Sequence, residues 1–179
     1  MNAFTLLRMR LRHVLWVIKD EGPVFSRACY VRLFEVLSKM KPESVVMIYG
    51  TEDWRIPCLM SKLNLKKVMT FVYGDYFDGT VRRMLGGGAK FGNQGKVNIV
   101  LREQEPNFVK LWSFPIDTLI ITSVGDAPPA DMKKLVSSIK RGGTLVTNDF
   151  SLFKEQYGNL ASLFSKFDVF ESTVIGVRR

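Results

Sequence analysis

The chain has 179 residues, of which 46% are apolar and 24% are charged, and its formal net charge at pH 7 is +9. This balance excludes an intrinsically disordered chain, and the length fits one domain that buries its own core without a metal or disulfide staple. No apolar run reaches the roughly 18 residues that a membrane-spanning helix requires, so we predict a single domain over residues 1–179 without a transmembrane segment.

Residues 1–41 are predicted to form a helical N-terminal extension. A first helix is expected over residues 2–19, and Gly22 with Pro23 ends it. A second helix begins near Pro23, with apolar residues at helical spacing, and ends before Pro42.

Residues 3–19 carry four cations, Arg8, Arg10, Arg12 and Lys19, and no acid. A basic start of this kind is typical of a transit peptide or of a helix that lies on a membrane surface. On a helix, Arg10 falls opposite the other three cations, which favours a packed helix with one basic edge. Peripheral membrane contact through residues 3–19 stays open as an alternative.

Beyond Pro42 the pattern changes to short apolar runs rich in β-branched residues, which are typical of strands buried on both faces. The predicted strands are residues 44–49, 67–73, 97–101, 116–122 and 144–147. Helices are expected over residues 56–63, 76–85, 131–140 and 152–164, and one or two terminal strands over residues 167–177. Gly142 and Gly143 should end the helix over residues 131–140.

Alternation of strands and helices predicts an α/β fold of three layers, with an open, mostly parallel sheet covered by helices on both faces. In such sheets ligands bind outside the carboxyl ends of the strands, where the strand order reverses. The carboxyl ends of the predicted strands, several of which carry acids, are residues 49–53, 73–75, 102–103, 122–123 and 148–149. Carboxylates there can accept hydrogen bonds from a ribose or an adenine, and each of them can equally cap a helix.

Residues 45–149 resemble the class I, Rossmann-like S-adenosylmethionine-dependent methyltransferases, as a divergent member. The similarity is clearest in residues 116–149, with the sequence IDTLIITSVGDAPPADMKKLVSSIKRGGTLVTND. This segment looks like the family's fourth strand, the following helix, a Lys-x-Gly-Gly turn and the fifth strand. Residues 45–51, VVMIYGT, are similar to the first strand and its glycine-containing cofactor loop. The resemblance implies an antiparallel C-terminal strand within residues 167–179.

The same resemblance implies that the chain is an S-adenosylmethionine-dependent methyltransferase whose methyl acceptor is unknown. It places the cofactor against Tyr49, Gly50, Thr51, Asp75, Glu103 and Thr122. Asp126 and Asp149 are candidate bases, and no catalytic residue is assigned. Metal-binding members of the family carry an Asp at the end of strand four, where this chain has Thr122, so no metal is predicted.

Two cofactor loops depart from the family pattern. An acid normally precedes a GxGxxG-like run after strand one, whereas here Tyr49 precedes the single Gly50. The acid that binds ribose normally ends strand two, where this chain has Val72 and Tyr73 and reaches Asp75 only afterwards. The alternative function is therefore a catalytically inactive methyltransferase-like fold that acts as a basic nucleic-acid- or protein-binding module.

The excess of positive charge favours an anionic partner. A nucleic acid, a membrane surface and an acidic protein all remain open, and so does a surface that only keeps the chain soluble. Tyr73 and Trp112 are among the aromatic residues that could stack on a nucleic acid, although we favour a place in the core for most of them.

The remaining sequence features narrow the chemistry further. No GxxxxGK[ST] run is present, which excludes a P-loop. Cys29 and Cys58 lack the spacing of a metal or redox site, so we expect buried thiols in a reducing compartment and predict a cytoplasmic protein.

Overall fold

The computed structural model describes residues 27–41, 43–50, 69–74, 97–102, 104–122, 127–148, 150–170 and 173–179. Its strands are β1 (Val45–Tyr49), β2 (Met69–Gly74), β3 (Val97–Leu101), β4 (Ile116–Ile121), β5 (Ile139–Thr147), β6 (Phe164–Phe170) and β7 (Thr173–Arg178). Its helices are α2 (Arg27–Ser38), α5 (Phe108–Leu111), α6 (Pro129–Ser138), α7 (Phe150–Gln156) and α8 (Gly158–Ala161).

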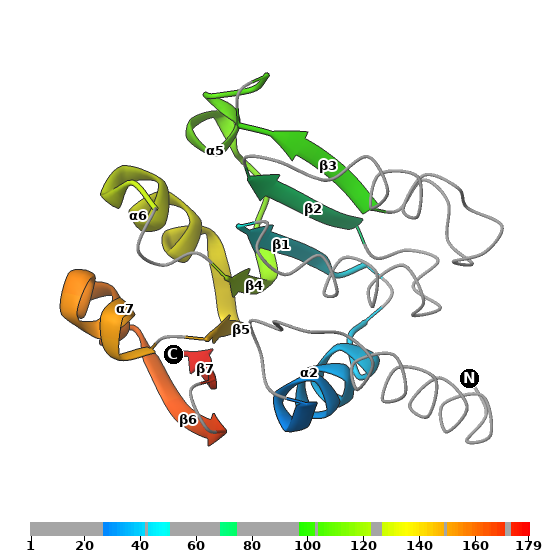
Figure 1. Ribbon diagram of the computed structural model, residues 1–179, viewed down its shortest axis with the longest axis vertical. Coiled ribbons are helices and arrows are strands. Elements are labelled where there is room, and N and C mark those ends of the chain that lie inside the picture. The colour runs from blue at the N-terminus through cyan, green and yellow to red at the C-terminus, as the bar shows by residue number, and fades with distance from the viewer. Residues whose placement is uncertain are drawn as a thin grey trace, which may run out of the picture.

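The strands form one sheet in the order β3-β2-β1-β4-β5-β7-β6. Strands β1 to β5 pair in parallel, and β7 runs antiparallel to both β5 and β6. Helices α6 and α7 lie on one side of the sheet and α2 lies on the other (Figure 1). The predicted α/β fold, with a mostly parallel sheet and an antiparallel C-terminal strand, is confirmed.

Alternate residues of the strands face the layer that contains α6. Val45, Met47 and Tyr49 of β1 belong to one core cluster, together with Leu119 of β4 and Leu145 of β5. The cluster also contains the apolar face of α6, formed by Met132, Leu135 and Val136. The apolar side chains that alternate along the strands and those at helical spacing along α6 therefore pack together in one core.

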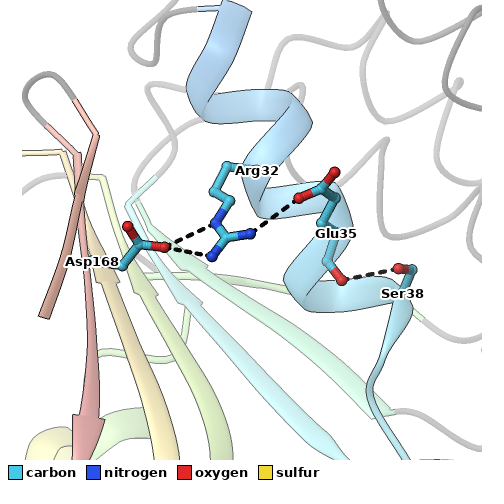
Figure 2. A network of polar contacts seen from close by, with 4 residues as sticks. All are labelled: Arg32, Glu35, Ser38 and Asp168. Carbon is cyan, nitrogen blue, oxygen red and sulfur yellow. Dashed lines mark hydrogen bonds and ion pairs between the residues drawn. The ribbon is translucent and has the colours of Figure 1, made fainter. Parts of the chain in front are cut away.

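Helix α2 brings a second apolar face, since Leu33, Phe34 and Leu37 are almost completely buried. A polar contact also ties α2 to β6. The Arg32 guanidinium donates two hydrogen bonds to Asp168 Oδ2, at 2.9 and 2.6 Å, and one to Glu35 at 3.1 Å (Figure 2). The hydrogen bond to Asp168 is the main cause that raises the pKa of Arg32. Because solvent reaches all three side chains, these contacts orient α2 more than they stabilise the fold.

The end of α6 and the start of β5 differ from the prediction. The helix stops at Ser138, two residues early, and β5 begins at Ile139 instead of residue 144. Arg178 of β7 donates to the carbonyl oxygens of Val136, Ser137 and Ile139, which satisfies the last carbonyls of the helix. The helix therefore ends where a distant arginine caps it, before Gly142 and Gly143.

The helix predicted over residues 152–164 is wrong in its bounds. It is divided into α7 and α8, and Phe164 already belongs to β6. Tyr157 separates the two helices with φ −131° and ψ 37°, and its hydroxyl donates to the carbonyl oxygen of Ala127 at 2.7 Å. This buried hydrogen bond holds Tyr157 in a non-helical conformation between α7 and α8.

Several predictions concern parts of the chain outside the described residues. They include the helices over residues 2–19, 56–63 and 76–85, and with them the membrane contact proposed for residues 3–19. The single-domain organisation stays a prediction. Across the ranges that the structure does describe, no helix has the length and apolar character needed to cross a bilayer.

Gly143 is expected to tolerate no larger residue. A Cβ atom there would lie 2.7 Å from Ile139 Cγ2, 2.9 Å from the Lys140 carbonyl oxygen and 3.0 Å from the Asp117 carbonyl oxygen. Since two of these atoms belong to the backbone, Gly143→Ala should lower the free energy of unfolding in urea by about 1–3 kcal/mol. Gly158→Ala is the control, because its Cβ would meet nothing within 4 Å. Equal effects of the two substitutions would contradict the packing at Gly143.

Candidate functional site

The carboxyl ends of four neighbouring strands meet at one edge of the sheet. Beyond the strand pairs, the Gly50 amide donates to the Tyr73 carbonyl oxygen, and the Thr122 amide donates to the Tyr49 carbonyl oxygen, each at 2.9 Å. The Arg102 amide donates to the Gly74 carbonyl oxygen at the same distance. Strand order reverses between β1 and β4, so this carboxyl edge contains the switch point at which open α/β sheets bind ligands.

Gly50 stands at this switch point, directly after β1. It is buried and has a φ of 108°, in the left-handed region that a side chain makes costly. The chain therefore turns at the end of β1 in a conformation that favours glycine. A glycine also leaves the backbone open to close approach by a ligand.

Thr122 lies beside Gly50, at the end of β4. Its side chain is buried, and its hydroxyl donates to the Tyr49 carbonyl oxygen at 3.3 Å. The hydroxyl oxygen keeps its lone pairs as acceptors. The switch point thus offers a glycine backbone and a fixed hydroxyl group.

Below this edge, Tyr49, Tyr73, Arg102 and Asp131 form a polar group that we name the edge cluster. The Arg102 guanidinium lies 5.5 Å from the ring centre of Tyr49 and 5.7 Å from that of Tyr73. Its Nη2 donates to the Tyr49 hydroxyl at 3.0 Å, and this hydroxyl donates to Asp131 Oδ2 at 3.4 Å. The Tyr49 hydroxyl therefore links a cation to a carboxylate, and the same cation lies over two aromatic rings.

Burial dominates the electrostatics of the edge cluster. It raises the pKa of the Tyr49 hydroxyl well above its ordinary value, although the Arg102 charge acts in the opposite direction. Burial also raises the pKa of Asp131, against the hydrogen bond from Tyr49 and the charge of Arg102. Tyr49 is therefore a neutral hydrogen-bond donor at physiological pH and does not act as a base.

The structure brings together three of the predicted cofactor residues, Tyr49, Gly50 and Thr122. The Tyr49 side chain belongs to the core cluster, so only its backbone reaches the switch point. Thr51, Asp75 and Glu103, like the candidate bases Asp126 and Asp149, lie outside the described residues.

Sequence reasoning did not assign the two charged members of the edge cluster. Arg102 follows β3 in a loop that the sequence singled out, but only its neighbour was assigned. Asp131 had the signal of an acid in the first turn of α6, which is typical of an ordinary helix start.

Tyr73 and Trp112 lie in the core, at 1% and 4% exposure, which agrees with the core position that the sequence favoured for most of the aromatic residues. Within the described ranges, no group of three or more His, Cys, Asp or Glu side chains gathers as metal ligands would.

Stability is expected to depend on pH through Asp131. Because its pKa is raised on folding, the stability associated with its protonated form is complete below its unfolded pKa, about 4, and is lost as pH rises through the folded pKa. The side chain at position 131 of the Asp131→Asn variant cannot titrate. The melting temperature of this variant, relative to that of the parent protein, should therefore increase as pH rises from about 3 to 6. Tyr49→Phe removes the hydrogen bond that lowers the pKa of Asp131 and should move this change to higher pH. If the melting temperature of Asp131→Asn instead fell relative to that of the parent protein as pH rises, this would contradict a raised pKa for Asp131.

Comparison with known proteins gives structural matches alone. No protein-family model matches the chain, and no curated protein matches its sequence. A Staphylococcus aureus structure assigned as a caffeoyl-CoA O-methyltransferase is 11% identical, with a TM-score of 0.66 over 100% of this chain and 93% of the other. A Podospora anserina methyltransferase with bound S-adenosylhomocysteine is 12% identical, with a TM-score of 0.65 over 95% and 87%.

An rRNA methylase from Streptococcus thermophilus is 12% identical, with a TM-score of 0.53 over 83% of this chain and 95% of the other. Structural matches at sequence identities this low establish the fold but leave the activity open. The matches cover nearly the whole of two of these proteins and most of the present chain. The chain therefore has the fold of the class I S-adenosylmethionine-dependent methyltransferases.

Proposed function

We propose that this chain is an S-adenosylmethionine-dependent methyltransferase that binds its cofactor at the carboxyl edge, against Gly50 and Thr122. The observation that carries the proposal is the position of Gly50, buried and with a φ of 108°, at the point where strand order reverses. Ligands of open α/β sheets bind at this point. The Podospora anserina methyltransferase of the same fold was solved with S-adenosylhomocysteine.

The described residues fit such a cofactor in two respects. Gly50 carries no side chain that would hold the cofactor away from the backbone. Thr122 offers its hydroxyl oxygen as an acceptor, while its hydrogen is directed to the Tyr49 carbonyl oxygen at 3.3 Å. Because the hydroxyl is fixed by this bond, little side-chain entropy is lost when a ligand binds.

The part of the chain in methyl transfer is chiefly to position the reactants. The cofactor, when bound, supplies a methyl group on a sulfonium, which a nucleophile attacks in line with the leaving sulfur. Holding two reactants in such a geometry can replace much of the barrier of a bimolecular reaction. The rigid hydrogen bonds that join the ends of β1, β2 and β4 serve this purpose, since they fix Gly50 and Thr122 relative to each other.

Calorimetry with S-adenosylhomocysteine tests the proposal. We expect saturable binding to the full chain, and Thr122→Val should weaken it by about tenfold, the equivalent of one hydrogen bond. Thr118→Val is the matched control, because Thr118 is also a buried threonine but lies in β4, where it pairs with Thr144 near the opposite edge. It should leave the affinity unchanged.

Two outcomes would refute the proposal. One is no binding of S-adenosylhomocysteine or S-adenosylmethionine at millimolar concentration by a chain whose circular dichroism shows it to be folded. The other is equal weakening by Thr122→Val and Thr118→Val, since this would place the ligand elsewhere.

The second candidate function is an inactive methyltransferase-like fold that binds a nucleic acid or another anionic partner. It is favoured by Tyr49, the last residue of β1, and Tyr73, the next to last residue of β2. They lie where the family carries acids for the cofactor, and their rings are buried around Arg102. With a net charge of +9, such a module should bind RNA with an affinity that falls steeply with salt. RNA binding of this kind without S-adenosylhomocysteine binding would favour the second function over the first.

A further inference from the structure

A pocket of about 550 Å³ lies at the amino edge of the sheet, opposite the carboxyl edge. Its walls come from the end of α2, the residues that lead into β1, the start of β4 and the first half of β5. Volumes of this size are typical of small-molecule sites. The pocket reaches Thr118 of β4, four residues before Thr122, and because a strand rises about 3.3 Å per residue, roughly 13 Å separate this amino-edge pocket from the switch point.

Four cations and two acids line the amino-edge pocket: Lys39, Lys41, Lys140, Arg141, Glu43 and Asp117. The Asp117 charge is already compensated. Its carboxylate accepts two hydrogen bonds from Lys140 Nζ, at 2.9 and 3.0 Å, and one from the Val45 amide at 2.8 Å. Lys140 and Asp117 therefore form an internal pair that leaves the other charges of the pocket for a ligand.

Lys39, Lys41 and Arg141 are exposed, and none of them has an ion pair with the described part of the chain. Against the one carboxylate of Glu43, they leave a formal excess of two positive charges around the pocket. Lysines at the end of α2 also suit the dipole of that helix. Arg141 does not have this role, because Arg178 already occupies the last carbonyls of α6.

Part of the wall formed by β5, at Gly142 and Gly143, has no side chain. Ile139 pairs with Ile116, and Thr144 pairs with Thr118, so residues 140–143 leave the regular ladder opposite Asp117. Gly142 has a φ of 75°, and a Cβ built there would meet no atom within 4 Å. A ligand can therefore approach the main chain here, as anions do at other glycine-rich turns.

We propose that the amino-edge pocket binds a phosphate monoester through Lys39, Lys41 and Arg141. At pH 7 a monoester carries a charge of about −1.5 to −2, which matches the excess of the pocket. The phosphate can belong to a small phosphorylated metabolite or to the 5′ end of a nucleic acid, because both present the same group. This site does not depend on the proposed function, since the two lie at opposite edges of the sheet.

The test titrates the full chain with uridine 5′-monophosphate and, separately, with uridine, while excess S-adenosylhomocysteine is present to keep nucleosides from the carboxyl edge. We expect the amide resonances of Ser44, Gly142 and Gly143 to shift with the monophosphate and not with uridine. The triple variant Lys39→Gln, Lys41→Gln, Arg141→Gln should weaken binding by about tenfold or more. Glu43→Gln removes the opposing carboxylate and should tighten binding by roughly twofold to fivefold.

The matched control is the triple variant Lys110→Gln, Lys134→Gln, Lys154→Gln, which removes the same charge from exposed sites on α5, α6 and α7. It should change the affinity by less than about threefold, because exposed charges at a distance are screened. An oligouridylate with a 5′-phosphate that binds more tightly than uridine 5′-monophosphate would identify nucleic-acid ends as the source. The reverse order would identify a free metabolite.

Three results would overturn the inference. They are equal binding of uridine and its monophosphate, equal losses in the two triple variants, and the absence of shifts at Ser44, Gly142 and Gly143 at 10 mM monophosphate, a concentration about 100 times that of the protein. An oligouridylate with a 5′-hydroxyl that binds as tightly as the 5′-phosphorylated one would also count against a monoester.

Discussion

The burial of β1 on both faces is the constraint on which the rest of the structure depends. All five of its side chains are buried, and its backbone pairs in parallel with β2 on one side and β4 on the other. A strand in this position can carry almost no polar side chain, and its amides and carbonyls must all find partners in its neighbours. The end of β1 is therefore fixed relative to β2 and β4, which makes the switch point beside Gly50 rigid.

The sequence predicted the elements that satisfy this constraint and missed those that depend on distant partners. Residues 97–101 form β3 as expected, since a short run of β-branched residues in a parallel sheet has few other solutions. The predicted end of α6 was wrong because the helix is capped by Arg178, which lies 39 residues beyond Ile139. The break at Tyr157 depends on a carbonyl 30 residues earlier, at Ala127. No local pattern contains such contacts.

The same limit applies to the carboxyl edge. Gly50 and Thr122 could be found because Gly50 directly follows one predicted strand and Thr122 ends another, and the carboxyl ends of parallel strands lie at the same edge of a sheet. The edge cluster could not, because Tyr49 and Asp131 are 82 residues apart, and the sequence does not say which face of β1 a side chain at its end will occupy. The ring of Tyr49 lies in the core layer with α6, so that its hydroxyl orders Arg102 and Asp131 while its carbonyl holds Thr122.

The two edges of the sheet depend on different parts of the chain. The carboxyl edge is built by the strands themselves, and any protein of this fold has one. The amino-edge pocket needs α2 as well, because Lys39 and Lys41 directly follow that helix. Arg32 holds α2 to Asp168 of β6, and β6 is joined through β7 to β5, which supplies the opposite wall of the pocket. Helix α2 is thus part of the proposed phosphate site, since a change in its angle would move two of the three cations that we propose bind the phosphate.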